Sequence, residues 1–143
     1  MIVITTQCFA PKIGGIEALM TGMAEAMSNA GKKVLVLADG KNETDDIAKK
    51  YEIIRFSGWK PLRRRNKANF LKKYSKLNNI EAVYADSWKS IEYLKGLNTK
   101  VIALAHGTEI PKRYFDTIYG YFNIKKRRII SSYKNCNKIA ANS

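Results

Sequence analysis

The sequence predicts an α/β domain with a doubly wound, mostly parallel sheet. Short apolar runs rich in Val, Ile, Leu and Ala alternate with longer segments whose apolar residues recur at helical spacing. Several of these runs are apolar at nearly every position, which is typical of strands covered by helices on both faces. A length of 143 residues suits one domain with a single core, so we treat residues 1–143 as one unit.

The first strand, helix and second strand lie within residues 2–38. Ile2 to Thr6 form a β-branched run that is too short for a helix. From Ile16 onward the apolar residues follow one stripe of a helix, which Gly31 ends. Residues 33–38 are a continuous apolar run, so the economical interpretation is a right-handed βαβ unit.

The same alternation continues to the end of the sequence. Further strands are expected at Tyr51–Phe56, Ile80–Ala85, Lys100–Gly107 and Lys138–Ser143. Helices are expected from about Asn66 to Leu77, around Trp88, Ile91 and Leu94, and over a long, mostly helical stretch from Pro111 to Lys134. This order is typical of a Rossmann-like sheet. Because a terminal strand is usually followed by something that covers it, we expect one domain of a longer protein, and a naturally short chain is the alternative.

Charge and cysteine content narrow the class of protein. Lys and Arg number 26 against 12 Asp and Glu, and the net charge of +14 favours an anionic partner: nucleic acid, an anionic membrane surface or a phosphorylated substrate. Cys8 and Cys136 are the only cysteines, and neither lies in a CxxC or His-rich pattern, so we expect reduced thiols and no metal site. No secretory signal or long apolar run is visible, and we expect a cytoplasmic protein.

Two adjacent glycines, Gly14 and Gly15, stand between the first strand and its helix. Residues without side chains at a helix start expose N–H groups to an anion, so the pair suits a phosphate. A tight turn with no ligand explains the pair about equally well. The GxGxxG and GxxxxGK[ST] patterns are both absent, which disfavours a dinucleotide site despite Asp39 after the second strand, and also disfavours a P-loop.

His106 is the single histidine of the chain and follows the fifth expected strand. At the carboxyl end of a strand and before a glycine, it is expected to point into a cleft, although a solitary histidine is more often structural. Glu109 follows as a second site carboxylate or as a first-turn acid for the next helix.

Four ordered segments resemble the retaining GT-B glycosyltransferases of family four. Members often carry a proline-rich GGxE loop, a helix leading into GHxVxVL, a histidine-glycine loop after the fifth strand, and a small-residue pattern near a serine in the sixth. The chain reads FAPKIGGIE, AGKKVLVLADG, VIALAHGTE and KIAANS at these places. It departs at Ala10 and Lys32, where proline and histidine are usual, and residues 41–97 match least.

The resemblance implies that the chain is the N-terminal, acceptor-side half of a GT-B enzyme acting with its own C-terminal, donor-binding domain. A nucleotide sugar would be the co-substrate and a lipid-linked sugar or cell-envelope glycan precursor the acceptor, with no cofactor or metal. His106 would contact the transferred sugar as the catalytic-site residue. Gly14, Gly15 and Glu17 would form the loop facing donor phosphates or acceptor, and Lys12 and Glu109 are further candidates for acceptor or cleft contacts.

A basic segment lies between Arg55 and Lys76 and contains no acid. Anionic headgroups attract such a segment, so peripheral docking at the inner face of the membrane is one hypothesis, and a solvated helix face is the other. Nucleic acid is not the favoured partner, because aromatic residues are not interleaved with the basic ones and no known binding pattern is present. A basic nucleic-acid-binding module or a non-catalytic Rossmann-type binding domain remains the alternative function. The candidate anion contacts are Lys60, Arg63, Arg64, Arg65, Lys67, Lys72, Lys73 and Lys76.

Overall fold

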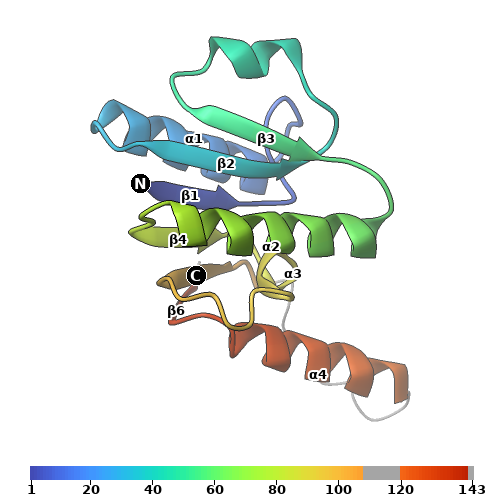
Figure 1. Ribbon diagram of the computed structural model, residues 1–143. Helices are drawn as coiled ribbons and strands as arrows, with labels where there is room; N and C mark the ends of the chain where they lie inside the picture. The colour runs from blue at the N-terminus through green and yellow to red at the C-terminus, as the bar shows by residue number, and fades with distance from the viewer. Residues whose placement is uncertain (108–119, 142–143) are drawn as a thin grey trace.

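The computed structural model describes residues 1–107 and 120–141 (Figure 1). The strands are β1 (Ile2–Thr5), β2 (Val34–Asp39), β3 (Glu52–Phe56), β4 (Ala82–Ala85), β5 (Val101–Ala105) and β6 (Lys138–Ala141). The helices are α1 (Gly15–Asn29), α2 (Lys60–Leu77), α3 (Trp88–Ile91) and α4 (Gly120–Tyr133), with a short 3₁₀ helix, η1 (Thr44–Ala48), before β3.

The six strands form one sheet in the order β3-β2-β1-β4-β5-β6, and every neighbouring pair is parallel. The predicted doubly wound α/β fold is therefore confirmed, with a wholly parallel sheet among the described strands. The strand order reverses between β1 and β4. In open parallel sheets, ligands bind beyond the carboxyl ends of the strands at such a reversal.

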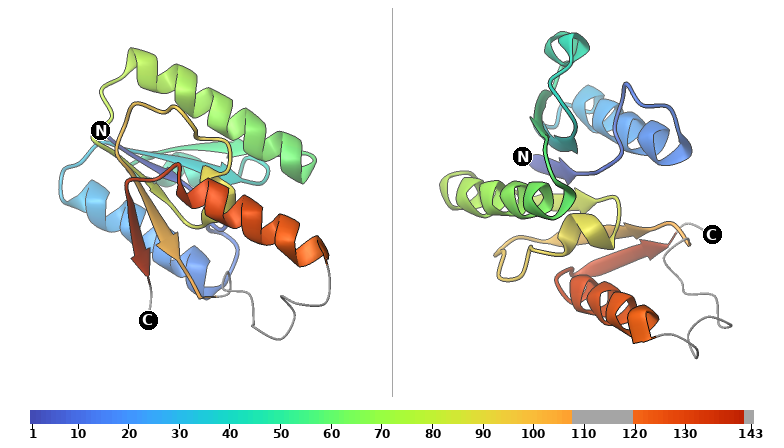
Figure 2. Two further views of the ribbon diagram at one scale, coloured as in Figure 1. Left: turned by 90° about the horizontal axis from the view of Figure 1, so that it is seen from below. Right: turned by 90° about the vertical axis from the view of Figure 1, so that its right-hand side faces the viewer.

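Helices cover both faces of the sheet, as Figure 2 shows for α1 and α2. On one face, Met20 of α1 is buried against Ile4 of β1 in a common cluster. On the other face, Leu71 of α2 packs with Val3 and Val83 in a cluster that also includes residues of α3. Because β1 and β4 bury side chains on both faces, their sequences are nearly continuous apolar runs rather than alternating ones.

Helix α1 ends where the sequence predicts. Gly31 adopts φ +79°, a backbone conformation that favours glycine, and the N–H of Lys32 donates to the carbonyl of Met27 at 3.0 Å. This closure pairs a carbonyl that the helix itself leaves free and turns the chain directly into β2.

Two expected helices differ from the structure, and one element was not expected. Helix α2 begins at Lys60 rather than near Asn66, because Pro61 stands in its first turn, where a missing N–H costs nothing. The expected helix around Trp88 and Ile91 is a single turn. The 3₁₀ helix η1 was not predicted, and residues 111–119 of the long helical stretch lie outside the described part.

Candidate functional site

A pocket of about 150 Å³ lies at the carboxyl ends of β1 and β4, where the strand order reverses. Side chains from β1's following loop, α1, the β4–α3 connection and the end of β5 contribute to it. It therefore combines segments that are far apart in the sequence. The residues that line the pocket include Gln7, Cys8, Ile16, Asp86, Lys89 and His106.

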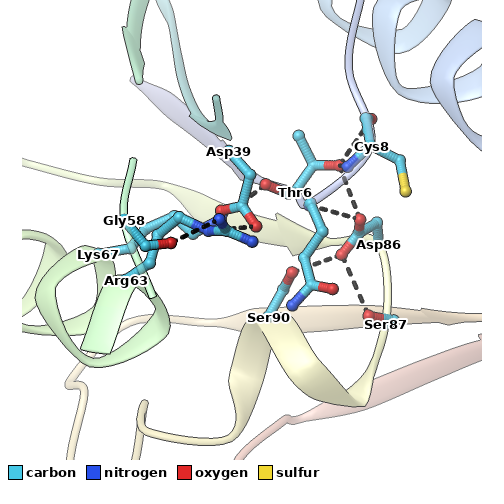
Figure 3. Close-up of polar contacts among 10 residues, drawn as sticks. Thr6, Cys8, Asp39, Gly58, Arg63, Lys67, Asp86, Ser87 and Ser90 are labelled. Carbon is cyan, nitrogen blue, oxygen red and sulfur yellow. Dashed lines mark hydrogen bonds and ion pairs between the residues drawn. The ribbon is translucent and has the colours of Figure 1, made fainter. Parts of the chain in front are cut away.

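Asp86 follows β4 and is held by four donors, several of which Figure 3 shows. Its Oδ2 accepts from the Thr6 hydroxyl and from the Gln7 backbone N–H, each at 2.7 Å. Its Oδ1 accepts from Ser90 at 2.5 Å and from Ser87 at 3.3 Å. With 2% of its surface exposed and both oxygens engaged, Asp86 ties β1 to α3 and is poorly placed to act as a base.

Asp39, at the end of β2, is engaged inside the protein (Figure 3). Lys67 Nζ lies 2.6 Å from Asp39 Oδ1 and donates to the Thr6 carbonyl at 2.6 Å. Arg63 Nε lies 2.9 Å from Asp39 Oδ2, an ion pair without hydrogen-bond alignment. A ribose-binding acid in this position needs a free carboxylate, and here both oxygens are taken.

Lys67 is the clearest correction to the sequence analysis. The prediction that it contacts an anionic surface is wrong, because 3% of its side chain is exposed and its ammonium group is paired with Asp39. Burial lowers the pKa of Lys67, and the attraction of Asp39 offsets only part of that effect. This lysine belongs to the core of the strand–helix junction.

The glycine pair divides into two different positions. A Cβ on Gly14, which caps the start of α1, would collide with the carboxylate of Glu17, whereas a Cβ on Gly15 would meet nothing within 4 Å. Glu17 therefore folds back over Gly14 at the helix start. Its negative charge partly occupies the positive end of the helix that was predicted to face a phosphate.

The Cys8 thiol is affected by the charges of Asp86 and Glu17. Burial, together with the nearby carboxylates of Asp86 and Glu17, raises the pKa of the Cys8 thiol to about 11. Exposed Lys12 on the same loop acts in the opposite direction and is therefore near Cys8. The site is thus electrostatically unfavourable for a thiolate.

His106 lies directly after β5 and lines the pocket, as the sequence analysis expected for its position. Its Nε2 is buried and has no hydrogen-bond partner among the described residues. Ile16 lines the same pocket, so the start of α1 and His106 share one cavity. Glu109, the other predicted carboxylate, lies outside the described residues.

Arg55 anchors the loop that precedes α1. Its side chain is 3% exposed; Nε and Nη2 donate to the two oxygens of Asp46 at 2.6 and 2.7 Å, and Nη2 also donates to the Ala10 carbonyl at 2.5 Å. The sequence analysis placed Arg55 at the start of the basic segment. Its place inside an apolar strand pattern was the signal for burial.

Two more residues that were predicted to contact an anion, Arg63 and Arg64, form ion pairs within the protein. Arg63 pairs with Asp39, and Arg64 pairs with Glu92, which also binds Arg128 of α4. The guanidinium groups of Arg64 and Arg128 both lie within 6.0 Å of the centre of the Trp88 ring. These arginines join α2, α3 and α4.

The rest of the basic segment faces solvent. Lys72 is partly exposed, and the exposed members are Lys60, Arg65, Lys73 and Lys76. Beside the start of α2, Trp59 and Leu62 are 74% and 52% exposed.

Lys89 and Lys125 also line the pocket, and the sequence analysis did not single out either as a site residue. Among residues 1–107 and 120–141, no group of three His, Cys, Asp or Glu side chains is placed to hold a metal ion. No helix in the same part of the chain has the length and apolar character needed to cross a bilayer. No protein-family model matches the sequence, and neither does any curated protein.

Proposed function

We propose that the chain is the acceptor-side, N-terminal domain of a retaining glycosyltransferase of the GT-B type. In this proposal a second, C-terminal domain binds the nucleotide sugar. The transferred sugar enters the pocket at the carboxyl edge of the sheet, and the acceptor is a lipid-linked sugar or a cell-envelope glycan precursor.

One observation carries the proposal. His106 after β5 and Ile16 in the first turn of α1 line one pocket at the reversal of strand order. The resemblance rests on motifs around these two places, and a common pocket is what a shared role in sugar transfer requires. Had Ile16 at the start of α1 and His106 lain on separate surfaces, no single ligand could have met both.

Each residue has a role in this proposal. His106 contacts the transferred sugar and supports the charge that develops as the donor bond breaks. Gly15 leaves open space over the backbone at the helix start, so that a ligand can approach the amides. Glu17 organises the loop by closing over Gly14, and Arg55 holds the loop through the Ala10 carbonyl.

The test uses the product of the complete gene, incubated with labelled nucleotide sugars and a membrane-lipid extract. Transfer of label to lipid or glycan is expected, and His106→Ala is expected to reduce kcat by about 100-fold or more, as for loss of one transition-state donor. Lys33→Gln, at the opposite edge of the sheet, serves as the matched surface control. Residues 1–143 alone are expected to show no turnover, and rapid transfer by them would contradict the two-domain proposal. Absence of transfer from every donor by the complete product would overturn the function.

We further propose that the start of α2 rests on an anionic membrane surface. Exposed Trp59 and Leu62 stand beside Lys60 and Arg65, a combination suited to the interface between headgroups and acyl chains. Sedimentation with anionic vesicles is expected, and Trp59→Ala with Leu62→Ala is expected to weaken it while leaving the charge unchanged. Equal binding to neutral vesicles would remove this proposal.

A further inference from the structure

The pocket at the carboxyl edge of the sheet contains positive charge that the described residues do not neutralise. Lys89 and Lys125, from α3 and α4, both line it. Within the described ranges neither has a carboxylate partner, whereas the neighbouring Arg64 and Arg128 both pair with Glu92. Lys89 Nζ also lies 5.9 Å from the centre of the Trp88 ring, a contact that leaves its charge without an acidic partner. Both lysines can therefore pair with an anionic ligand.

The carboxylate of the pocket lining is already committed. Asp86 receives four internal hydrogen bonds, from Thr6, Gln7, Ser87 and Ser90, so its charge is stabilised within the protein. Lys89 and Lys125 favour an anionic group placed beside them, against the negative charges of Asp86 and Glu17 that raise the pKa of Cys8 elsewhere in the site.

Two side-chain nitrogen atoms in the same pocket lack hydrogen-bond partners among the described residues. Gln7 Nε2 and His106 Nε2 are both buried, and neither has a hydrogen-bond partner in the part of the chain that the structure describes. A buried polar atom left unpaired costs about 1–3 kcal/mol. A ligand with hydroxyl groups beside its anionic group would pair these atoms while the lysines take the charge.

The size of the pocket limits what can enter it. Its volume is about 150 Å³. We therefore consider a phosphoryl group joined to a single sugar ring as the ligand, and a nucleotide is tested beside it below.

We propose that this pocket binds a sugar phosphate, with Lys89 and Lys125 on the phosphoryl oxygens and Gln7 and His106 on nearby hydroxyl groups. The assignment of this sugar phosphate as the acceptor rests on the proposed function. The anion site itself rests on the lysines and the unpaired polar atoms alone.

The test is an amide chemical-shift titration of the purified 143-residue chain. Glucose 1-phosphate is expected to shift the amide signals of Gln7, Ser87 and Lys89, and uncharged methyl glucoside is not. UDP supplies the alternative source of phosphate. Tighter binding of UDP than of glucose 1-phosphate at these amides would overturn the assignment to a sugar phosphate.

Matched variants test the role of the two lysines. Lys89→Gln combined with Lys125→Gln is expected to weaken glucose 1-phosphate binding at least about tenfold, since each charge-assisted hydrogen bond is worth more than a neutral one. Lys33→Gln combined with Lys100→Gln makes the same change of charge at the opposite edge of the sheet and should leave Kd unchanged. Equal affinities of the two double variants would overturn the anion site, whatever the outcome of the transferase assay. Conversely, binding without any transfer by the complete gene product would retain the anion site and remove its role as an acceptor site.

Discussion

Substitution of Asp39 by Asn is the most direct test of the buried ion pair beneath the site. In the wild type, the Lys67 ammonium lies 2.6 Å from Asp39, and both side chains are at most 4% exposed. Asn keeps the shape but leaves the buried lysine without a counter-charge. Removing one partner of such a pair costs about 3–5 kcal/mol, a large part of the 5–15 kcal/mol that stabilises a typical domain.

A double variant separates loss of the pair from loss of packing. Lys67→Met replaces the desolvated ammonium by an apolar chain, so the double variant contains no buried ammonium without a counter-charge. We therefore expect Asp39→Asn combined with Lys67→Met to be more stable than Asp39→Asn alone. If Asp39→Asn alone does not fold, the double variant is still expected to fold, so the order of stability can be tested.

Urea unfolding followed by far-UV circular dichroism measures these differences at neutral pH. Asp45→Asn and Lys50→Met are the matched controls, because both side chains are exposed and both changes are chemically the same. A loss below about 1 kcal/mol for Asp39→Asn, or strict additivity in the double variant, would refute the reasoning.

Three other predictions concern the loop and its neighbours. Gly14→Ala puts a poor N-cap residue at the start of α1 and displaces the flexible end of the Glu17 side chain, so it is expected to lower the unfolding free energy by about 1 kcal/mol. Gly15→Ala has open space and is expected to raise it by roughly 0.5 kcal/mol; a reversed order in urea unfolding would contradict this difference. A hydrogen bond from Arg55 lowers the pKa of Asp46 from its ordinary 3.8, so its stabilisation is present above pH 3.8 and is lost as pH falls through the lowered folded-state pKa. Melting temperatures should therefore fall less steeply with acid in Asp46→Asn, and parallel profiles would count against the pairing. At pH 8 the Cys8 thiol, with a pKa of about 11 instead of 9.0, should react with iodoacetamide about 100-fold more slowly than a free cysteine; peptide mass spectrometry measures the rate, and similar rates would contradict the charge environment.

The order of strands and helices could be read from the sequence because burial leaves a local pattern. β1, β2 and β4 are almost wholly buried, and their nearly continuous apolar sequences predicted this burial. Gly31 marked the end of α1 because few other residues take its positive φ. The position of His106 followed from the same pattern, since a residue after a parallel strand lies at the carboxyl edge of the sheet.

The partners of the charged residues could not be read in the same way. Lys67 looked like one more member of a basic segment, although it shares a helical stripe with buried Leu71 and that spacing was a usable signal. Its carboxylate partner, Asp39, lies on another element. Likewise, Lys89 and Lys125 meet only because α3 and α4 lie on the same side of the sheet as neighbours.

The amino-acid sequence by itself determined the α/β class, the approximate strand positions and the placement of His106 at the carboxyl edge of the sheet. Only the tertiary structure decided which charged side chains form ion pairs inside the protein. Lys67 pairs with Asp39, while Lys89 has no acidic partner among the described residues. The physical reason is that hydrophobic periodicity is a property of one segment, whereas ion pairing depends on distances between segments that the crossovers of the chain bring together.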